Sequence, residues 1–268
     1  MNQLEKSEIY AKAIAVWDRI RISMPDNPIL QGWSSFSQCD EDGIIRECLK
    51  RIAEQTPLSR TFIEVGCADG IENNSHQLLL DGFSGVWVDG NAKKIEALKK
   101  QLGGLSFKVL TVMNQFIALD NIHDLVRDSI RILNTDNIDF FSFDIDGNDL
   151  HLVQESLKII HPKLVCVEYN GNFPPPTRLT MEYNPGHRWG EDDYYSASLQ
   201  SWVDALSGYA LVCCNLSGVN AFFVRKDLLR GFTTYPVLEI YQPPRYWLAS
   251  GPFGHKRSLK WLKQTLQA

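Results

Sequence analysis

Two short apolar segments, residues 62–70 and 85–91, constrain the fold of this chain more than any other feature. The first contains Glu64 and then Gly66, and the second reaches Asp89 and then another glycine. A segment compatible with a helix separates them. A buried strand, a tight glycine turn, a helix and a second strand ending in an acid together form a βαβ unit. We therefore expect an α/β fold with a ligand site at the carboxyl ends of its strands.

The glycine spacing narrows the class of ligand. From Glu64 to Gly70 the pattern is Glu-x-Gly-x-x-x-Gly, which differs from the Gly-x-Gly-x-x-Gly of dinucleotide-binding proteins, and the chain lacks a Gly-Lys-Ser/Thr phosphate loop. We expect Gly66 and Gly70 to let the backbone approach a ligand closely. Asp89 lies where a carboxylate accepts both hydroxyls of a ribose. The spacing therefore disfavours a dinucleotide enzyme.

The alternation of strands and helices continues along the chain. Apolar runs predict strands near 61–65, 85–89, 106–112, 138–143 and 163–168. Helical periodicity predicts helices near 73–81, 92–102, 121–133 and 149–160. Asn91 and Asn148 are expected to be N-caps. A helix near 196–207 and a hairpin with strands at 209–213 and 220–224 follow. This order predicts a Rossmann-like, seven-stranded sheet with helices on both faces.

The expected domain division follows from this alternation. Two helices, near 4–22 and 40–54, precede the core, and a segment with a basic tail helix follows it. Ser37 and Asp40 stand at the start of the second helix in a Ser-x-x-Asp capping arrangement. The division is residues 1–56 for N-terminal helices packed on the core, 57–228 for the main domain, and 229–268 for a C-terminal extension.

A long loop, residues 170–195, interrupts the main domain. It holds three consecutive prolines and several aromatic, histidine and arginine residues, which are untypical of a plain linker. A loop of this length in a compact domain is either functional or disordered. We expect a lid that contacts the substrate. For His187, within this loop, a simple surface position is the alternative interpretation.

Composition excludes some partners. The net charge of −5 disfavours a broad phosphate-binding face, so nucleic acid is not an expected partner. No apolar run is long enough to span a membrane, and the charged first twenty residues do not resemble a signal peptide. The six cysteines include no Cys-x-x-Cys pair, which disfavours a zinc site. We expect a reduced, cytoplasmic protein, and the sequence leaves its oligomeric state open.

Six motifs occur in a fixed order. They are Ser-Gln-Cys-Asp-Glu-Asp-Gly at 37–43, the 64–70 segment with Glu-Asn-Asn-Ser at 72–75, Asp-Asn-Ile at 120–122, Asp-Ile-Asp-Gly-Asn-Asp at 144–149, Glu-Tyr-Asn at 168–170, and Tyr-Ser-Ala-Ser-Leu at 195–199 with Asn-Ala-Phe-Phe-Val-Arg at 220–225. Over roughly residues 33–228 the chain resembles the FkbM-like family of class I S-adenosylmethionine-dependent methyltransferases. The resemblance implies a methyltransferase sheet, S-adenosyl-L-methionine as methyl donor, and O-methylation of a sugar, glycan precursor or other small polar metabolite.

The resemblance also assigns cofactor-binding residues. It places Gln38 and Asp42 near the methionine end of the cofactor, although both could simply stabilise the first turn of their helix. Glu64 is expected near the methionine amino group or as a support of the Gly66 loop. Asn114, just after the third predicted strand, is a candidate for the adenine edge, and a plain turn residue is the alternative. The complete set is Gln38, Asp42, Glu64, Gly66, Gly70, Ser75, Asp89, Asn114 and Asp144.

Oxygen-bearing side chains gather at two further strand ends. Asp144 and Asp146 end the fourth predicted strand, and Glu168 and Asn170 follow the fifth. One interpretation is a divalent cation site for Mg²⁺ or Mn²⁺ formed by all four. The other is acid–base chemistry without metal, in which Asp144, Asp146 or His187 removes the acceptor proton. Helix capping is the structural alternative, and the sequence does not choose among them.

A protein of another class fits the same sequence. The fold can persist in a binding or scaffold protein without catalytic activity, because fold does not fix function. The acidic strand ends favour the enzyme, and cofactor binding separates the two hypotheses.

Overall fold

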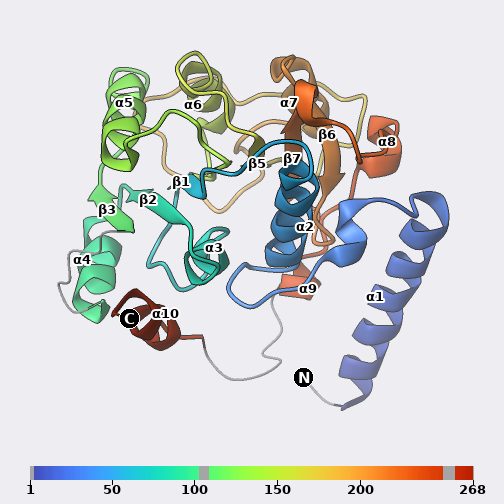
Figure 1. Cartoon of the computed structure of the whole chain (residues 1–268). Helices are drawn as coiled ribbons and strands as arrows, with labels where there is room; N and C mark the ends of the chain where they lie inside the picture. Colours follow the sequence, from blue (N-terminus) through green and yellow to red (C-terminus); the bar gives the residue numbers. More distant parts are fainter. Residues whose placement is uncertain (1–2, 103–108, 250–256, 268) are drawn as a thin grey trace.

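A seven-stranded mixed sheet forms the centre of the protein (Figure 1). The computed structural model describes residues 3–102, 109–249 and 257–267. The strand order is β3-β2-β1-β4-β5-β7-β6, with the first five strands parallel and β7 antiparallel to both neighbours. This is the order of the Rossmann-like methyltransferase sheet, and it confirms the predicted fold class. The strands are β1 (Thr61–Val65), β2 (Ser84–Asp89), β3 (Leu110–Asn114), β4 (Phe140–Phe143), β5 (Leu164–Glu168), β6 (Tyr209–Cys214) and β7 (Asn220–Arg225).

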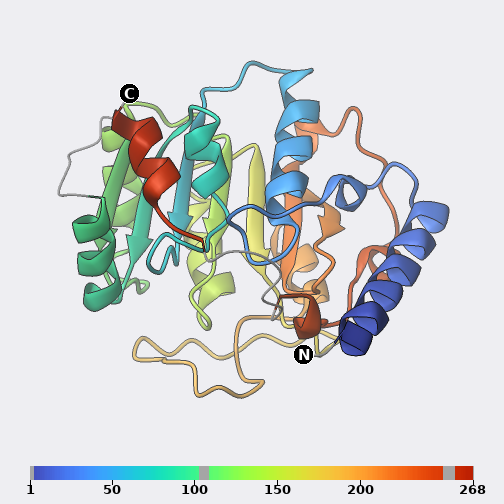
Figure 2. The ribbon, with the colours of Figure 1, turned by 90° about the horizontal axis from the view of Figure 1, so that it is seen from below.

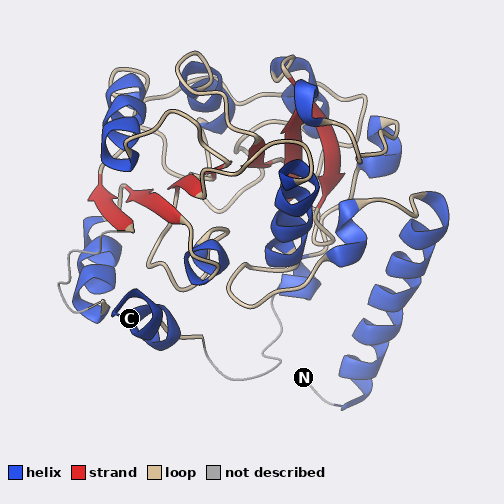
Figure 3. Ribbon diagram, in the orientation of Figure 1, coloured by secondary structure: helices blue, strands red, loops and turns tan. Residues whose placement is uncertain are grey.

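Helices cover both faces of the sheet (Figure 3). Figure 1 shows α5, α6 and α7 on one side and α3 and α4 on the other. The α-helices are α1 (Gln3–Ser23), α2 (Glu41–Ala53), α3 (His76–Leu80), α4 (Ala92–Gln101), α5 (Ile122–Leu133), α6 (Asp149–Ser156), α7 (Leu199–Ala205), α8 (Val237–Ile240), α9 (Tyr246–Ala249) and α10 (Lys260–Gln267). Two 3₁₀ helices, η1 (Pro28–Gln31) and η2 (Lys226–Leu228), lie among them. Because both faces are covered, the central strands read as continuous apolar runs, and every residue of β4 is buried.

Helix starts differ from the sequence-based expectations in three places. Ser37 pairs with Asp42 and not with Asp40: the Ser37 Oγ accepts from the Asp42 amide at 3.1 Å, and an Asp42 oxygen accepts from the Ser37 amide at 3.1 Å. Asn148, the predicted cap of α6, makes no capping bond. The helix expected from residue 73 begins only at His76, because the preceding residues form a loop. Asn91 does cap α4, accepting from two amides, as predicted.

Two glycines of the first motif are required by packing within the protein. A Cβ on Gly66, which has φ +95°, would lie 1.6 Å from the Asp144 carbonyl oxygen. A Cβ on Gly70, which has φ +70°, would lie 2.7 Å from the Trp87 ring. The space at each Cβ position is therefore filled by protein, whereas we expected it to admit a ligand. A role of these glycines in cofactor binding stays a prediction.

Of the elements outside the main domain, α2 and α10 pack on it, whereas most of the described part of α1 is exposed. The inward face of α2 is buried against the core, as predicted. The C-terminal helix α10 packs on α3, and the two lie side by side in Figures 1 and 2. Among the described helices, none is long and apolar enough to cross a membrane.

Candidate functional site

The carboxyl ends of the parallel strands bring the predicted residues to one edge of the sheet. Asp89 and Asn114 end β2 and β3 and face each other in the strand register. Asp144 follows β4, and Glu168 ends β5. The loop of residues 170–195, called the strap from here on, runs along this edge (Figure 2). Open α/β sheets bind their ligands at this edge.

Asp89 holds two loops at the end of β2. Its carboxylate oxygens accept from the amides of Ala68 at 2.8 Å and Asn91 at 2.6 Å. The side chain of Asn114 donates to the Asp89 carbonyl oxygen at 2.9 Å. A carboxylate offers about four lone-pair sites. Half-buried Asp89 therefore keeps acceptor capacity for a ligand hydroxyl.

Glu64 supports the loop that precedes α3. Its buried carboxylate accepts from the amides of Asn74 at 2.8 Å and Ser75 at 3.0 Å, and from the Ser75 hydroxyl. The Trp87 indole N–H donates to the same hydroxyl at 2.7 Å. Burial raises the pKa of Glu64 to about 7. Of the two roles expected for Glu64, these contacts agree with loop support, and they turn Ser75 toward the protein interior.

Buried polar atoms of three residues beside this loop, Asp42, Asn73 and His76, lack partners within the described part of the chain, the His76 atom being its Nε2. One carboxylate oxygen of Asp42 accepts from the amides of residues 35–37 at 2.6–3.1 Å, but its Oδ1 has no partner among the residues that the structure describes. The Asn73 side-chain nitrogen is equally buried and, within the same part of the chain, unpartnered. The Phe36 ring stacks on the His76 ring, with centroids 3.8 Å apart, and this contact joins the loop before α2 to the start of α3. Gln38, also predicted at this end, is exposed.

Three carboxylates meet beyond β4 and β5. One oxygen each of Asp144, Asp146 and Glu168 lies within 4.8 Å of the others. Burial, reinforced by the neighbouring carboxyl groups, raises the pKa of Asp144 and of Glu168 well above their ordinary values. Burial also raises the pKa of Asp146, although Lys94 and His187 oppose that shift. The sequence-based prediction that these groups converge is consistent with this geometry.

The turn that carries Asp146 is held from two sides. Asp149 accepts from the amides of Ile145 at 2.8 Å and Gly147 at 2.7 Å, which keeps Asp146 in the left-handed region at φ +56°. His187 of the strap lies over the turn, with its Nε2 3.1 Å from the Asp146 carbonyl oxygen. A Cβ on Gly147 would lie 2.3 Å from the His187 ring, so glycine is required for this approach.

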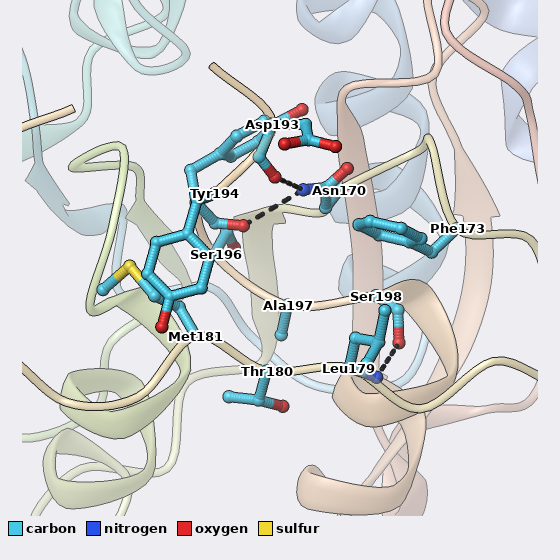
Figure 4. Close-up of a pocket in the computed structure, with 11 residues that line it drawn as sticks. Asn170, Phe173, Leu179, Thr180, Met181, Asp193, Tyr194, Ser196, Ala197 and Ser198 are labelled. Atoms are coloured by element: carbon cyan, nitrogen blue, oxygen red, sulfur yellow. Dashed lines mark hydrogen bonds between the residues drawn. The ribbon is translucent and has the colours of Figure 1, made fainter. Parts of the chain in front are cut away.

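Asn170, the fourth predicted metal ligand, is engaged by the loop that follows it. Its side-chain nitrogen donates to the carbonyl oxygens of Asp193 at 2.8 Å and Tyr195 at 3.2 Å (Figure 4). Its oxygen accepts from the Asn172 amide at 3.2 Å. The structure thus groups three of the four predicted ligands and gives Asn170 a role in positioning the strap.

A cavity of about 150 Å³ lies between the two arms of the strap (Figure 4). Most of its lining is apolar, and the lining residues are Asn170, Phe173, Leu179, Thr180, Met181, Asp193, Tyr194, Tyr195, Ser196, Ala197 and Ser198. Tyr195 connects this cavity with the carboxylates. Burial and its contact with the Tyr246 hydroxyl at 3.3 Å raise the pKa of Tyr195, and Glu168 adds to the shift.

Sequence reasoning missed three residues of this edge. Asn73 and Tyr195 stand inside the recognised motifs, which was a usable signal, but capping and packing explained them equally well. Tyr246 belongs to the C-terminal extension and has no such signal, because only the folded chain brings it to Tyr195.

The strand order and the ligand-binding edge define a Rossmann-like methyltransferase fold. No family model and no curated protein matches this chain. The FkbM-like resemblance therefore stays a prediction.

Among solved structures, a putative caffeoyl-CoA O-methyltransferase from Staphylococcus aureus is 14% identical, with 83% of this chain and 100% of that chain covered and a TM-score of 0.45. An O-methyltransferase from Bacillus cereus in complex with SAH is 12% identical, with coverage of 80% and 91% and a TM-score of 0.45. The N-terminal domain of EvdMO1 in the presence of SAH and D-fucose is 10% identical, with coverage of 79% and 96% and a TM-score of 0.43. Such distant likeness leaves activity and acceptor open.

Proposed function

We propose that this protein is an S-adenosylmethionine-dependent methyltransferase that methylates a hydroxyl group of a small polar acceptor, such as a sugar or glycan precursor. The observation that carries the proposal is the methyltransferase strand order with acidic side chains at the carboxyl ends of β2, β4 and β5. The alternative, a scaffold protein without activity, gives the buried and unpartnered carboxylate oxygen of Glu168 no task that offsets the cost of burying it.

The polar groups of the edge fit the cofactor from end to end. Asp89 would accept from the ribose hydroxyls, and Asn114 lies beside it for the adenine edge. At the other end, the unpartnered Asp42 oxygen suits an ammonium group and the unpartnered Asn73 nitrogen suits a carboxylate. A methionine moiety carries both groups. Glu64 would act through the loop that it holds.

The bound cofactor would supply a methyl group on a positively charged sulfur. As the acceptor oxygen forms its bond to the methyl carbon, the carbon–sulfur bond breaks and its electron pair stays on sulfur, which becomes neutral. The hydroxyl proton must leave as well. Asp144, Asp146 or His187 would accept it, and a carboxylate with a raised pKa is a better base near neutral pH. Mg²⁺ or Mn²⁺ at the same carboxylates would instead lower the pKa of the hydroxyl.

The acceptor would bind between the carboxylates and the strap. Carboxylates accept hydrogen bonds from the hydroxyl groups of a sugar-like molecule, and aromatic rings pack against the C–H groups of such a molecule. Trp189 packs on Tyr195 with ring centroids 6.3 Å apart, which places two aromatic rings on the strap side of this space. The main contribution of the protein would be to align the reacting atoms, and such positioning can lower a barrier by about 7–11 kcal/mol.

Calorimetric titration of the full chain with S-adenosylmethionine and S-adenosylhomocysteine tests the proposal. We expect Asp89→Ala to weaken binding by about tenfold or more, since two hydroxyl contacts are lost. Asp136→Ala is the control, because Asp136 is an exposed carboxylate in the turn before β4, at the opposite edge of the sheet. Thermal unfolding of each variant checks that loss of the Ala68 and Asn91 contacts has not unfolded the site.

Two results would contradict the proposal. If the wild-type chain binds neither compound, the scaffold hypothesis replaces the enzyme. If Asp89→Ala binds both compounds as the wild type does, Asp89 has no place in the ribose site.

A further inference from the structure

The three carboxylates at the end of β4 and β5 lack a compensating cation of their own. Within the described ranges, no Lys or Arg forms a salt bridge with Asp144, Asp146 or Glu168. Lys94 and His187 oppose the pKa shift of Asp146, the most exposed of the three, and neither is among the groups that shift the pKa of Asp144 or of Glu168. Carboxylates this close repel one another when ionised, so they need a shared proton or a cation.

Glu168 gives the second observation. Only 8% of the residue is exposed, and its Oε2 is buried without a hydrogen-bond partner in the part of the chain that the structure describes. A carboxylate oxygen in such a position is costly unless a ligand satisfies it. Its neighbours in the cluster are acceptors themselves when ionised, so they cannot be that ligand. The group that satisfies Glu168 must therefore be a cation or a donor.

We propose that Asp144, Asp146 and Glu168 bind one hard divalent cation of the Mg²⁺ and Mn²⁺ class. Oxygen ligands from carboxylates are typical of these ions. Ligands at about 2.1 Å place oxygens on opposite sides of an ion about 4.2 Å apart, and the three observed oxygens lie within 4.8 Å of one another.

The position of the cation specifies the acceptor further, and this step rests on the proposed function. Three protein ligands leave about three positions of a six-coordinate ion for other oxygens. Burial raises the pKa of Tyr195, at the end of the strap, and Glu168 and Asp144 lie close enough for their charges to raise it further, so the strap borders the cluster. Two hydroxyls on neighbouring carbons would occupy two positions of one ion. The structure thus assigns the acceptor to molecules with a vicinal diol, one hydroxyl of which receives the methyl group.

The metal is tested on the full chain without cofactor. After treatment with chelator and its removal, Mn²⁺ is titrated and free Mn²⁺ is followed by electron paramagnetic resonance. We expect one Mn²⁺ per chain, displaced by Mg²⁺, and an affinity about tenfold lower or worse in Glu168→Gln and Asp146→Asn, because ligand charge sets affinity. Glu239→Gln is the matched control, since Glu239 is an exposed residue of α8, beside the edge strand β6.

Thermal unfolding shows whether Glu168 binds the cation or only stabilises the fold. In chelator, we expect Glu168→Gln to unfold at the same temperature as the wild type or higher, because one repulsive charge is gone. Saturating Mn²⁺ should raise the unfolding temperature of the wild type and the control but not of Glu168→Gln. A variant that unfolds earlier in chelator and still responds to Mn²⁺ would overturn the assignment.

Other outcomes also decide the matter. Absence of Mn²⁺ binding to the wild type, or binding that neither variant weakens, would overturn the cation site. Failure of the cation site can be told apart from failure of the proposed function. Asp89→Ala should bind Mn²⁺ normally while losing S-adenosylmethionine. If Glu168→Gln loses cofactor binding and the wild type binds no metal, the carboxylates face the positively charged cofactor instead. Methyl transfer to monohydroxy acceptors as fast as to vicinal diols would overturn the acceptor assignment alone.

Discussion

Residues of the two glycine-containing segments act in two ways at this edge of the sheet: some allow close packing, and others bind backbone amides. Gly66 provides space for another strand end, whereas Asp89 and Glu64 organise loops through backbone amides. A glycine in such a motif is commonly associated with ligand approach. Here the backbone of Asp144 occupies the position where a side chain would start, so the glycine also fixes how β1 and β4 end together.

Gly66→Ala should therefore destabilise the protein strongly. We expect a loss of about 3 kcal/mol or more in the free energy of unfolding, because a methyl group would overlap the Asp144 carbonyl. Equilibrium unfolding in urea measures it. Gly231→Ala is the control: its φ of +84° is similar, but nothing lies within 4 Å of its Cβ position. Left-handed strain alone should cost the control about 1–2 kcal/mol. Equal losses in the two variants would contradict the packing explanation.

Among the elements, the strap connects several loops across this edge of the sheet. It contacts the turn before α6 through reciprocal bonds between Asn184 and Asn148, at 2.7 and 3.0 Å. Arg188 lies over the Phe116 ring, 5.6 Å from its centroid, and the Tyr183 hydroxyl accepts from the Leu119 amide at 2.9 Å. The strap thus spans from the end of β5 to the loop after β3, across the proposed acceptor site.

Shortening the strap tip should separate binding from transfer. With residues 185–190 replaced by two glycines, we expect methyl transfer to fall by about a hundredfold, since acceptor alignment is lost. Cofactor affinity should change by less than about threefold, because the predicted cofactor residues lie in other loops. Single-turnover rates and calorimetry measure the two quantities. Parallel loss of both would mean that the strap is structural.

At the scale of the whole molecule, the C-terminal segment packs on α3 and on the loops beside the candidate site. Leu262 of α10 is fully buried, and Arg257 donates to Glu72 at 2.8 Å and to the Phe36 carbonyl oxygen at 3.2 Å. These contacts hold the loop around Phe36, whose amides donate to Asp42, and the loop that carries Asn73. The basic residues of this helix had no evident role in the sequence, and its apolar face explains its position.

Leu262→Ala should destabilise the whole protein by about 2–5 kcal/mol, the usual cost of truncating a buried leucine. Trp261→Ala, on the neighbouring residue with 67% of its surface exposed, should change stability by less than about 0.5 kcal/mol although it removes more atoms. Urea unfolding compares the two. Similar losses would show that α10 does not pack on α3 through Leu262.

The sequence by itself determined the topology and much of the candidate site. Apolar runs and helical periods are local signals, and the glycine and carboxylate spacing of β1 and β2 lies within thirty residues, so the fold class and the position of Asp89 at a strand end could be predicted. Asp144 and Glu168 could also be placed at one edge, because parallel strands end together.

Only the tertiary structure decided which polar side chains still have a hydrogen-bonding atom available for a ligand. Asn170 and Ser75 are of suitable chemical type, yet both are engaged by the surrounding protein. The unpartnered atoms of Asp42, Asn73 and Glu168 look the same in sequence as satisfied ones. Hydrogen-bond partners of a buried group come from distant segments, and whether a polar atom is left without one depends on distances of a few tenths of an ångström, which spacing along the chain does not specify.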